Sequence, residues 1–148
     1  VIGTSWQVSD KALLAFDFNW HNWNKYKLKI NYKNEIPGIL QDYRGNPSNW
    51  KNTIVLNLGY EHKLNSKWTL RGGLTYDEAP EPKEARTLVG GQVVDAWLFS
   101  LGAGITLDKT IINFGYIYTY GPKVEGFIED AKYSMNLHEL FIGYVKKY

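Results

Sequence analysis

The sequence predicts an all-β protein, a transmembrane antiparallel β-barrel, from three observations. Segments of about ten residues alternate apolar with polar or small side chains, and the last one carries Leu140, Ile142 and Tyr144 on one side before ending at the aromatic Tyr148. Aromatic residues make up 16% of the chain, whereas its mean hydropathy is negative. Short and long connections alternate between the segments. These features are typical of outer-membrane barrels, whose strands face lipid with every second residue and carry aromatic girdles.

The composition narrows the class of protein. No apolar run approaches the roughly 20 residues of a membrane helix. In a barrel the lipid-facing half of each strand is diluted by the inward half, so a low mean hydropathy is compatible with membrane insertion. The chain has no cysteine, which excludes disulfides, thiol nucleophiles and cysteine metal sites. The formal net charge is +2 with scattered Lys and Arg, so no basic patch for nucleic acid is expected.

Alternation between turn-rich stretches predicts seven strands. We expect them at 1–8, 12–23, 52–64, 67–77, 94–107, 110–121 and 135–148. The tight turns among them are centred on Asp10, Ser66 and Asp108. Long polar loops are expected at about 24–51, 78–93 and 122–134. Outer-membrane barrels have short periplasmic turns and long extracellular loops, which predicts a periplasmic C-terminus.

An odd number of strands predicts part of a larger barrel. A complete single-chain bacterial barrel has an even number of strands and both ends in the periplasm. One alternative makes 24–34 an eighth strand and closes a small barrel. We favour a long second strand that continues above the membrane, because Lys25, Lys27 and Lys29 would otherwise face the lumen or lipid.

The alternation also assigns each side chain to a face. In the clearest strand, Phe114, Tyr116 and Tyr118 point outward, whereas Asn113 and Gly115 point inward. The inward polar set is Asp17, Asn19, His21, Asn57, Glu61, Arg71, Ser100, Asn113 and Glu139. Six glycines share this inward face and either leave space beside the wall or accommodate its curvature: Gly59, Gly73, Gly102, Gly104, Gly115 and Gly143.

The inward polar set has two interpretations. Ionisable groups at membrane depth face protein or water and usually pair, so a structural ion-pair network is the simpler one. In the other, Arg71 anchors the anionic head group of a ligand, because a guanidinium binds a carboxylate in a forked geometry. Ser100 and Asn113 support Arg71 in this hypothesis, and Asp17 and Asn19 complete the candidate ligand-binding set.

No catalytic or metal site is predicted. The three histidines lie on different predicted strands without metal-ligand spacing, and His62 and His138 fall on the outward parity, where an interfacial role is expected. An acidic stretch interrupted by Pro80 and Pro82 predicts a rigid rim, with calcium binding as a weaker alternative. Its carboxylates are Asp77, Glu78, Glu81 and Glu84.

Three stretches resemble the FadL/TodX (OMPP1) family of outer-membrane transporters. They are the strand start Asn49 to Thr53, the hairpin SKWTLRGGLTYDEAPEP with the later Arg86 and Trp97, and DFNWHNWNKYKLKI. The resemblance implies a monomeric fourteen-stranded barrel plugged by an N-terminal hatch, of which this chain is the C-terminal half. Residues 89–96 depart from the family pattern, so the chemistry of that loop does not carry over.

The resemblance implies passive uptake of long-chain fatty acids or aromatic hydrocarbons across the bacterial outer membrane, without enzymatic activity or a cofactor. The expected partners are the hydrophobic ligand, outer-membrane lipid, lipopolysaccharide and the N-terminal half of the barrel. A general diffusion porin and a complete eight-stranded structural or enzymatic barrel are the alternatives. A soluble ligand-binding barrel is excluded, because its outward faces would expose a contiguous apolar band.

Overall fold

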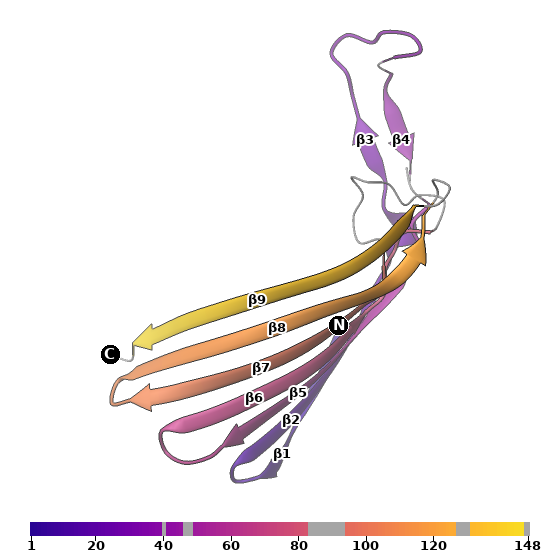
Figure 1. Cartoon of the computed structure of the whole chain (residues 1–148). Helices are drawn as coiled ribbons and strands as arrows, with labels where there is room; N and C mark the ends of the chain where they lie inside the picture. Colours follow the sequence, from indigo (N-terminus) through magenta and orange to yellow (C-terminus); the bar gives the residue numbers. More distant parts are fainter. Residues whose placement is uncertain (40, 46–48, 83–93, 127–130, 147–148) are drawn as a thin grey trace.

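A single curved antiparallel sheet forms most of the protein (Figure 1). The computed structural model describes residues 1–39, 41–45, 49–82, 94–126 and 131–146. The sheet contains seven strands, as predicted, and the described ranges contain no α-helix. Their bounds are β1 (Ile2–Ser9), β2 (Ala12–His21), β5 (Thr53–Lys63), β6 (Trp68–Asp77), β7 (Ala96–Leu107), β8 (Thr110–Glu125) and β9 (Lys132–Lys146).

The strands follow one another across the sheet in the order β1-β2-β5-β6-β7-β8-β9, and every neighbouring pair is antiparallel. Strands β1 and β9 are therefore the two edges of an open sheet. The tight turns gather at one end of the strands in Figure 1, and the hairpin of β3 (Leu28–Ile30) and β4 (Tyr43–Gly45) lies at the other end. No helix in the described ranges is long and apolar enough to cross a membrane.

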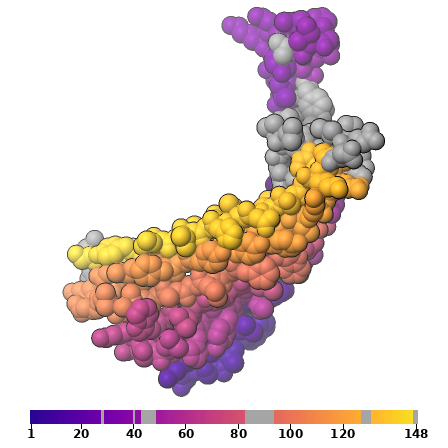
Figure 2. Space-filling model, viewed as in Figure 1, coloured from indigo at the N-terminus to yellow at the C-terminus, as the bar shows by residue number. Residues whose placement is uncertain are grey.

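The segment that follows His21 differs from both structures that the sequence suggested, a longer β2 and an eighth strand. The long continuation of β2 is wrong, because β2 ends at His21 and a 3-10 helix, η1 (Trp23–Lys25), follows. The eighth-strand alternative is also wrong. Strand β3 pairs with β4 in a separate hairpin that projects from the wall (Figures 1 and 2).

Aromatic packing explains why the chain leaves the wall at this point. The ring of Trp50 lies edge-on to Trp23 at 5.4 Å and stacks on Tyr26 at 5.4 Å between centroids. The side-chain oxygen of Asn52 accepts the backbone N–H of Asn24 at 3.0 Å. These contacts tie η1 to the start of β5. The three lysines of this segment, Lys25, Lys27 and Lys29, are all exposed.

Strands β8 and β9 extend beyond their predicted ends. The ladder continues past a bulge between Gly121 and Val124 to the pair of Glu125 with Lys132. The backbone N–H of Gly126 then donates to the carbonyl of Ala131 at 2.8 Å. Much of the loop expected at 122–134 is therefore hairpin, because the ladder re-forms beyond the bulge.

The register separates the two faces of the sheet as the alternation predicted. One ladder row aligns Phe16, Leu58, Leu74, Phe99 and Tyr118. The adjacent row, on the opposite face, aligns Asp17, Asn57, Thr75, Leu98 and Thr119. We call the face of Phe16 the outer face and the face of Asp17, which also carries Arg71, the inner face.

The outer face is apolar and open to its surroundings. Leu101 is 68% exposed, and Leu140 and Ile142 are more exposed still. Among the described residues the few buried apolar side chains are small, and Ala79, Val94 and Ala96 flank the connection between β6 and β7. The wall is thus one layer thick and has no conventional core. Such a large apolar surface requires an apolar environment or a partner.

The outer-face aromatic residues fall into two bands. The β1–β2 ladder ends at the pair of Ser9 with Ala12. The row of Ala12 reaches Ala103 on β7, and the β7–β8 ladder continues beyond it to the pair of Leu107 with Thr110. The line of tight turns therefore slopes across the rows, as it does when strands are inclined to a membrane. Near that line lie Trp6, Tyr60, Trp68 and Tyr144. Far from it lie Trp20, Tyr76, Trp97, Tyr118 and Tyr120.

The surface between these bands is lined mainly by aliphatic and phenylalanine side chains, including Leu58, Leu74, Leu101 and Phe114. Tyr116, opposite Leu101 on β8, also lies there. An apolar belt between two aromatic girdles is the arrangement of a transmembrane barrel wall. We call the aromatic band beside the tight turns the turn-side girdle and the other the loop-side girdle.

Candidate ligand site on the inner face

Arg71 on β6 is the centre of a polar cluster on the inner face. Its Nε donates to Oε2 of Glu61, the residue directly opposite on β5, at 2.7 Å. Its Nη1 donates to Oδ1 of Asn113 on β8 at 3.1 Å. The side chain of Arg71 thus crosses β7 to reach the next strand.

Glycine on β7 makes this crossing possible. A Cβ atom on Gly104 would lie 2.8 Å from Oδ1 of Asn113 and 3.1 Å from Nη1 of Arg71. Both separations are shorter than ordinary contacts, so a side chain here would displace one of the bonded groups. The absence of a side chain at Gly104 therefore allows the hydrogen bond between Arg71 and Asn113.

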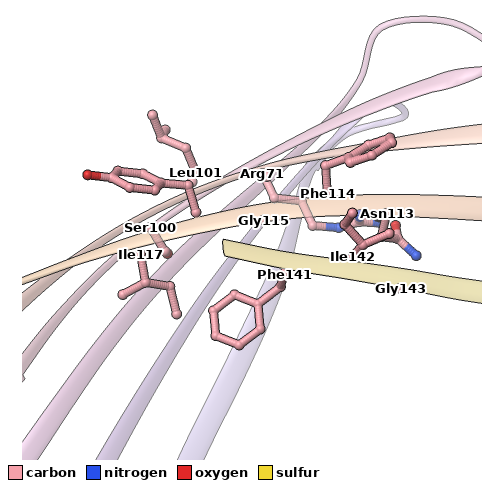
Figure 3. Close-up of a pocket in the computed structure, with 13 residues that line it drawn as sticks. Arg71, Ser100, Leu101, Asn113, Phe114, Gly115, Ile117, Phe141, Ile142 and Gly143 are labelled. Carbon is pink, nitrogen blue, oxygen red and sulfur yellow. Dashed lines mark hydrogen bonds between the residues drawn. The ribbon is translucent and has the colours of Figure 1, made fainter. Parts of the chain in front are cut away.

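A hollow of about 530 Å³ lies beside this cluster, and residues of both faces of the sheet line it (Figure 3). Its floor follows one ladder row, in which Gly102 and Gly115 separate Arg71 on β6 from Phe141 on β9. Ile117 also lines the hollow. Figure 3 shows Ile117 and Phe141 on one side of the sheet and Leu101 and Phe114 on the other. We call the space between Arg71 and Phe141 the glycine slot.

The glycine slot is polar at one end and apolar at the other. Arg71 and Asn113 supply N–H donors and an amide, whereas Ile117 and Phe141 supply hydrocarbon. Spacing between neighbouring strands is about 4.8 Å, so the backbones of Arg71 and Phe141 lie roughly 14 Å apart. The Arg71 side chain spans part of this distance, because it reaches Asn113 on β8. The shape suits an elongated amphipathic molecule lying flat against the wall.

The structure brings together only part of the predicted site. Arg71, Ser100 and Asn113 all line the hollow. Asp17 and Asn19 lie on β2 in other ladder rows, where Asp17 pairs with Asn57 and Asn19 with Val55, and neither lines the hollow. The predicted residues therefore belong to two separate places on the inner face.

Sequence reasoning missed Ile117 and Phe141. Both share the inward parity with the polar residues, but an apolar residue at such a position gave no chemical signal. The available clue was their neighbours: Phe141 lies opposite Gly115, and Ile117 lies opposite Ser100. An inward apolar side chain beside a glycine row marks an apolar wall next to open space.

The Arg71–Glu61 ion pair is only partly shielded from solvent. The two side chains are 46% and 28% exposed. A pair of this kind stabilises a fold by about 0–1 kcal/mol. The guanidinium also has further N–H groups beyond the Nε and Nη1 bonds. The geometry is compatible both with bracing of the wall and with binding of an additional anion.

Glu78 of the acidic rim, together with Asp95, holds the ends of the strands. Glu78 pairs with Lys51 at 2.8 Å and accepts the backbone N–H of Ile54 at 3.2 Å. Asp95 accepts the hydroxyl of Tyr76 at 3.1 Å and the backbone N–H of Ala79 at 2.9 Å. Glu84 and Arg86 lie outside the described residues, and within those described there is no group of three or more potential metal ligands.

The three histidines lie apart. His62 is 3.1 Å from the hydroxyl of Tyr60, and His138 is 2.7 Å from the hydroxyl of Tyr116. Both are on the outer face, His62 in the turn-side girdle and His138 in the loop-side girdle. His21 is at the end of β2, edge-on to Trp23.

A comparison with known protein families shows which family the chain belongs to. The family described as outer membrane protein transport protein (OMPP1/FadL/TodX) matches residues 1–139. The chain belongs to this family. The resemblance seen in the hairpin around Arg71 is thereby confirmed, and the family is one of outer-membrane transport proteins.

Individual relatives in the OMPP1/FadL/TodX family are distant and longer. Outer membrane protein P1 of Haemophilus influenzae strain Rd is 24% identical over 120 residues, which are 80% of this chain and 25% of that protein. A second outer membrane protein P1 of Haemophilus influenzae matches to the same extent. The chain therefore spans about a quarter of the length of these relatives.

A solved structure supports the same fold. The crystal structure of a Pseudomonas aeruginosa FadL homologue superimposes with a TM-score of 0.64 at 21% identity. The match covers 95% of this chain and 32% of that protein. The open seven-stranded sheet thus has the fold of one part of a FadL-like protein.

Proposed function

We propose that these strands form part of an outer-membrane barrel that carries hydrophobic small molecules, long-chain fatty acids or aromatic hydrocarbons, by passive diffusion. The tight turns and the C-terminus face the periplasm in this proposal, and the long connections face outside. The remaining strands and a plug come from the rest of the polypeptide, and the complete barrel is monomeric. The observation that carries the proposal is the glycine slot, with Arg71 at one end and Phe141 at the other.

The glycine slot suits a fatty acid best among these ligands. Glycines at 102 and 115 let a flat hydrocarbon chain approach the backbone, and burial of apolar area stabilises it by about 25 cal/mol per Å². A carboxylate at the polar end receives charge-assisted N–H bonds from Arg71. The slot is open along one side, which favours binding weak enough for onward diffusion. No step in this passage requires a catalytic group, a cofactor or an energy source.

Substitution of Glu61 distinguishes the two roles considered for Arg71, ligand binding and bracing of the wall. Glu61 and a ligand carboxylate compete for the same guanidinium, because both accept from Arg71. If the pair only braces the wall, removal of either partner lowers stability and leaves ligand affinity unchanged. If Arg71 anchors a ligand, the two substitutions change affinity in opposite directions.

The experiment measures binding of a fluorescent long-chain fatty acid to the full-length protein in detergent. We expect Arg71→Gln to weaken binding about tenfold or more, because a hydrogen bond to a charged group contributes about 1.5–3 kcal/mol. We expect Glu61→Gln to strengthen binding. The methyl ester of the same fatty acid, which lacks the carboxylate, should bind wild type and Arg71→Gln alike. Equal losses for the acid and the ester, or weaker binding by Glu61→Gln, would refute the role of Arg71.

A further inference from the structure

A second hollow, of about 440 Å³, lies where β2 ends at the side of the long connections. It is formed by the last residues of β2 and by η1, away from the glycine slot. Its lining consists of Trp20, His21, Asn22, Trp23, Lys25 and Tyr26. We call it the β2-end pocket.

The aromatic side of the β2-end pocket is held in place from behind. Trp50 contacts Trp23 edge to face, with ring planes at 87°, and stacks on Tyr26, with planes at 15°. The bond from the Asn24 N–H to Asn52 fixes η1 against the start of β5. These contacts form within the protein, so the pocket is organised before any ligand arrives. Preorganisation of this kind lowers the entropy cost of binding.

The β2-end pocket lies beside the loop-side girdle, through its lining residue Trp20. Trp20 belongs to the loop-side girdle and is 53% exposed on the outer face. Aromatic residues of a girdle lie where hydrocarbon meets the polar head groups. A ligand in the pocket is therefore at the level of lipid head groups, with its lipid tails free to descend along the outer face.

Lys25 gives the β2-end pocket a cationic side. It lines the pocket from η1 and is exposed. Lys51, which follows Trp50 in the chain, is instead ion-paired with Glu78 at 2.8 Å. An ammonium group binds phosphate as a point charge, and the faces of Trp and Tyr rings pack against the C–H faces of sugars. The pocket therefore combines the two chemistries of a sugar phosphate.

We propose that the β2-end pocket binds the phosphorylated sugar head group of a glycolipid in the adjacent leaflet. Lys25 contacts the phosphate, and Trp20 and Tyr26 pack against the sugar. The inference rests on the orientation in the proposed function, since the outer leaflet of a bacterial outer membrane is the one that carries phosphorylated glycolipid. Such a site fixes the height of the wall in the membrane and operates independently of ligand passage along the inner face.

Native mass spectrometry of the full-length protein in detergent, titrated with hexa-acylated lipid A, tests this proposal. We expect Lys25→Gln to reduce lipid A retention about fivefold or more, and Trp20→Leu to reduce it as well. Lys27→Gln is the matched control, because Lys27 is an exposed lysine of the same segment that does not line the pocket. Lipid A without phosphate should bind wild type as weakly as phosphorylated lipid A binds Lys25→Gln. Inorganic phosphate at the same concentration should not displace lipid A.

Equal retention by Lys25→Gln and Lys27→Gln would overturn the site, and so would equal binding of lipid A with and without phosphate. Heat-dependent migration in gels verifies that each variant is folded. Fatty-acid binding is measured in parallel and should be unchanged in Lys25→Gln. A wild-type protein that retains lipid A but binds no fatty acid would refute the proposed function and leave the glycolipid site standing.

Discussion

Single residues on the inner face decide whether neighbouring side chains can meet. Gly104 is required by the Arg71–Asn113 bond, since a Cβ there would lie 2.8 Å from Oδ1 of Asn113. Gly59 shares the same face, but a Cβ there would have its nearest neighbour, the Cβ of Ala15, at 3.9 Å. The sequence predicted both as inward glycines, and parity alone could not distinguish them. The difference depends on which side chains cross the strand.

Substitution of these two glycines tests that difference. We expect Gly104→Ala to disrupt the Arg71–Asn113 bond and weaken fatty-acid binding by about 1 kcal/mol, or roughly fivefold. Gly59→Ala should leave binding unchanged, because the new methyl group makes only an ordinary contact. Titration with the fluorescent fatty acid measures both variants. Wild-type affinity in Gly104→Ala would mean that Asn113 does not orient Arg71 for the ligand.

Whole strands show which sequence patterns are reliable and which are not. Alternation correctly predicted the wall strands and their faces, because each strand contains its own period of two. The segment after His21 was predicted wrongly, since alternation continues through Lys25, Lys27 and Lys29 although the chain has left the wall. Contacts of Trp23 and Tyr26 with the distant Trp50 override the local pattern there.

Because β7 and β8 have one face toward lipid and one toward the inside, a charge introduced on the outer face should destabilise the protein more than a charge on the inner face. We expect Leu101→Arg, on the outer face between the girdles, to lower the free energy of unfolding from lipid vesicles by about 2–4 kcal/mol. Ile117→Arg lies on the inner face of the neighbouring strand and should avoid this lipid cost. Gly102 is a poorer control, because a Cβ there would lie 3.3 Å from the carbonyl oxygen of Phe114. Similar losses at Leu101 and Ile117 in denaturant titrations would contradict the assignment of the faces.

The molecule as a whole is a curved wall with two free edges, β1 and β9, among its described strands. In hydrocarbon every backbone N–H and C=O group must find a partner within the protein. An open edge in lipid is therefore unstable and pairs with another strand. The match to only part of each longer relative is consistent with further strands completing the barrel.

The two edges predict how the 148-residue polypeptide behaves when it is produced alone. We expect it not to form a protease-resistant monomer in lipid vesicles, because both edge strands lack partners in the bilayer. The full-length protein is the control and should be protected and heat-modifiable. Digestion followed by gel electrophoresis provides the measurement. A protected monomer of 17.1 kDa would contradict this expectation and show that the segment closes by itself.

The sequence by itself determined the all-β class, seven wall strands, their two faces and the family, because alternation, turn residues and hairpin motifs are local properties of the chain. Only the tertiary structure decided that Arg71 meets Glu61 and Asn113, that Phe141 lies across two glycine strands from Arg71, and that Trp50 holds η1 away from the wall. These relationships depend on the register between strands and on contacts between distant segments. A period of two assigns a side chain to a face, but register decides which neighbours it meets there.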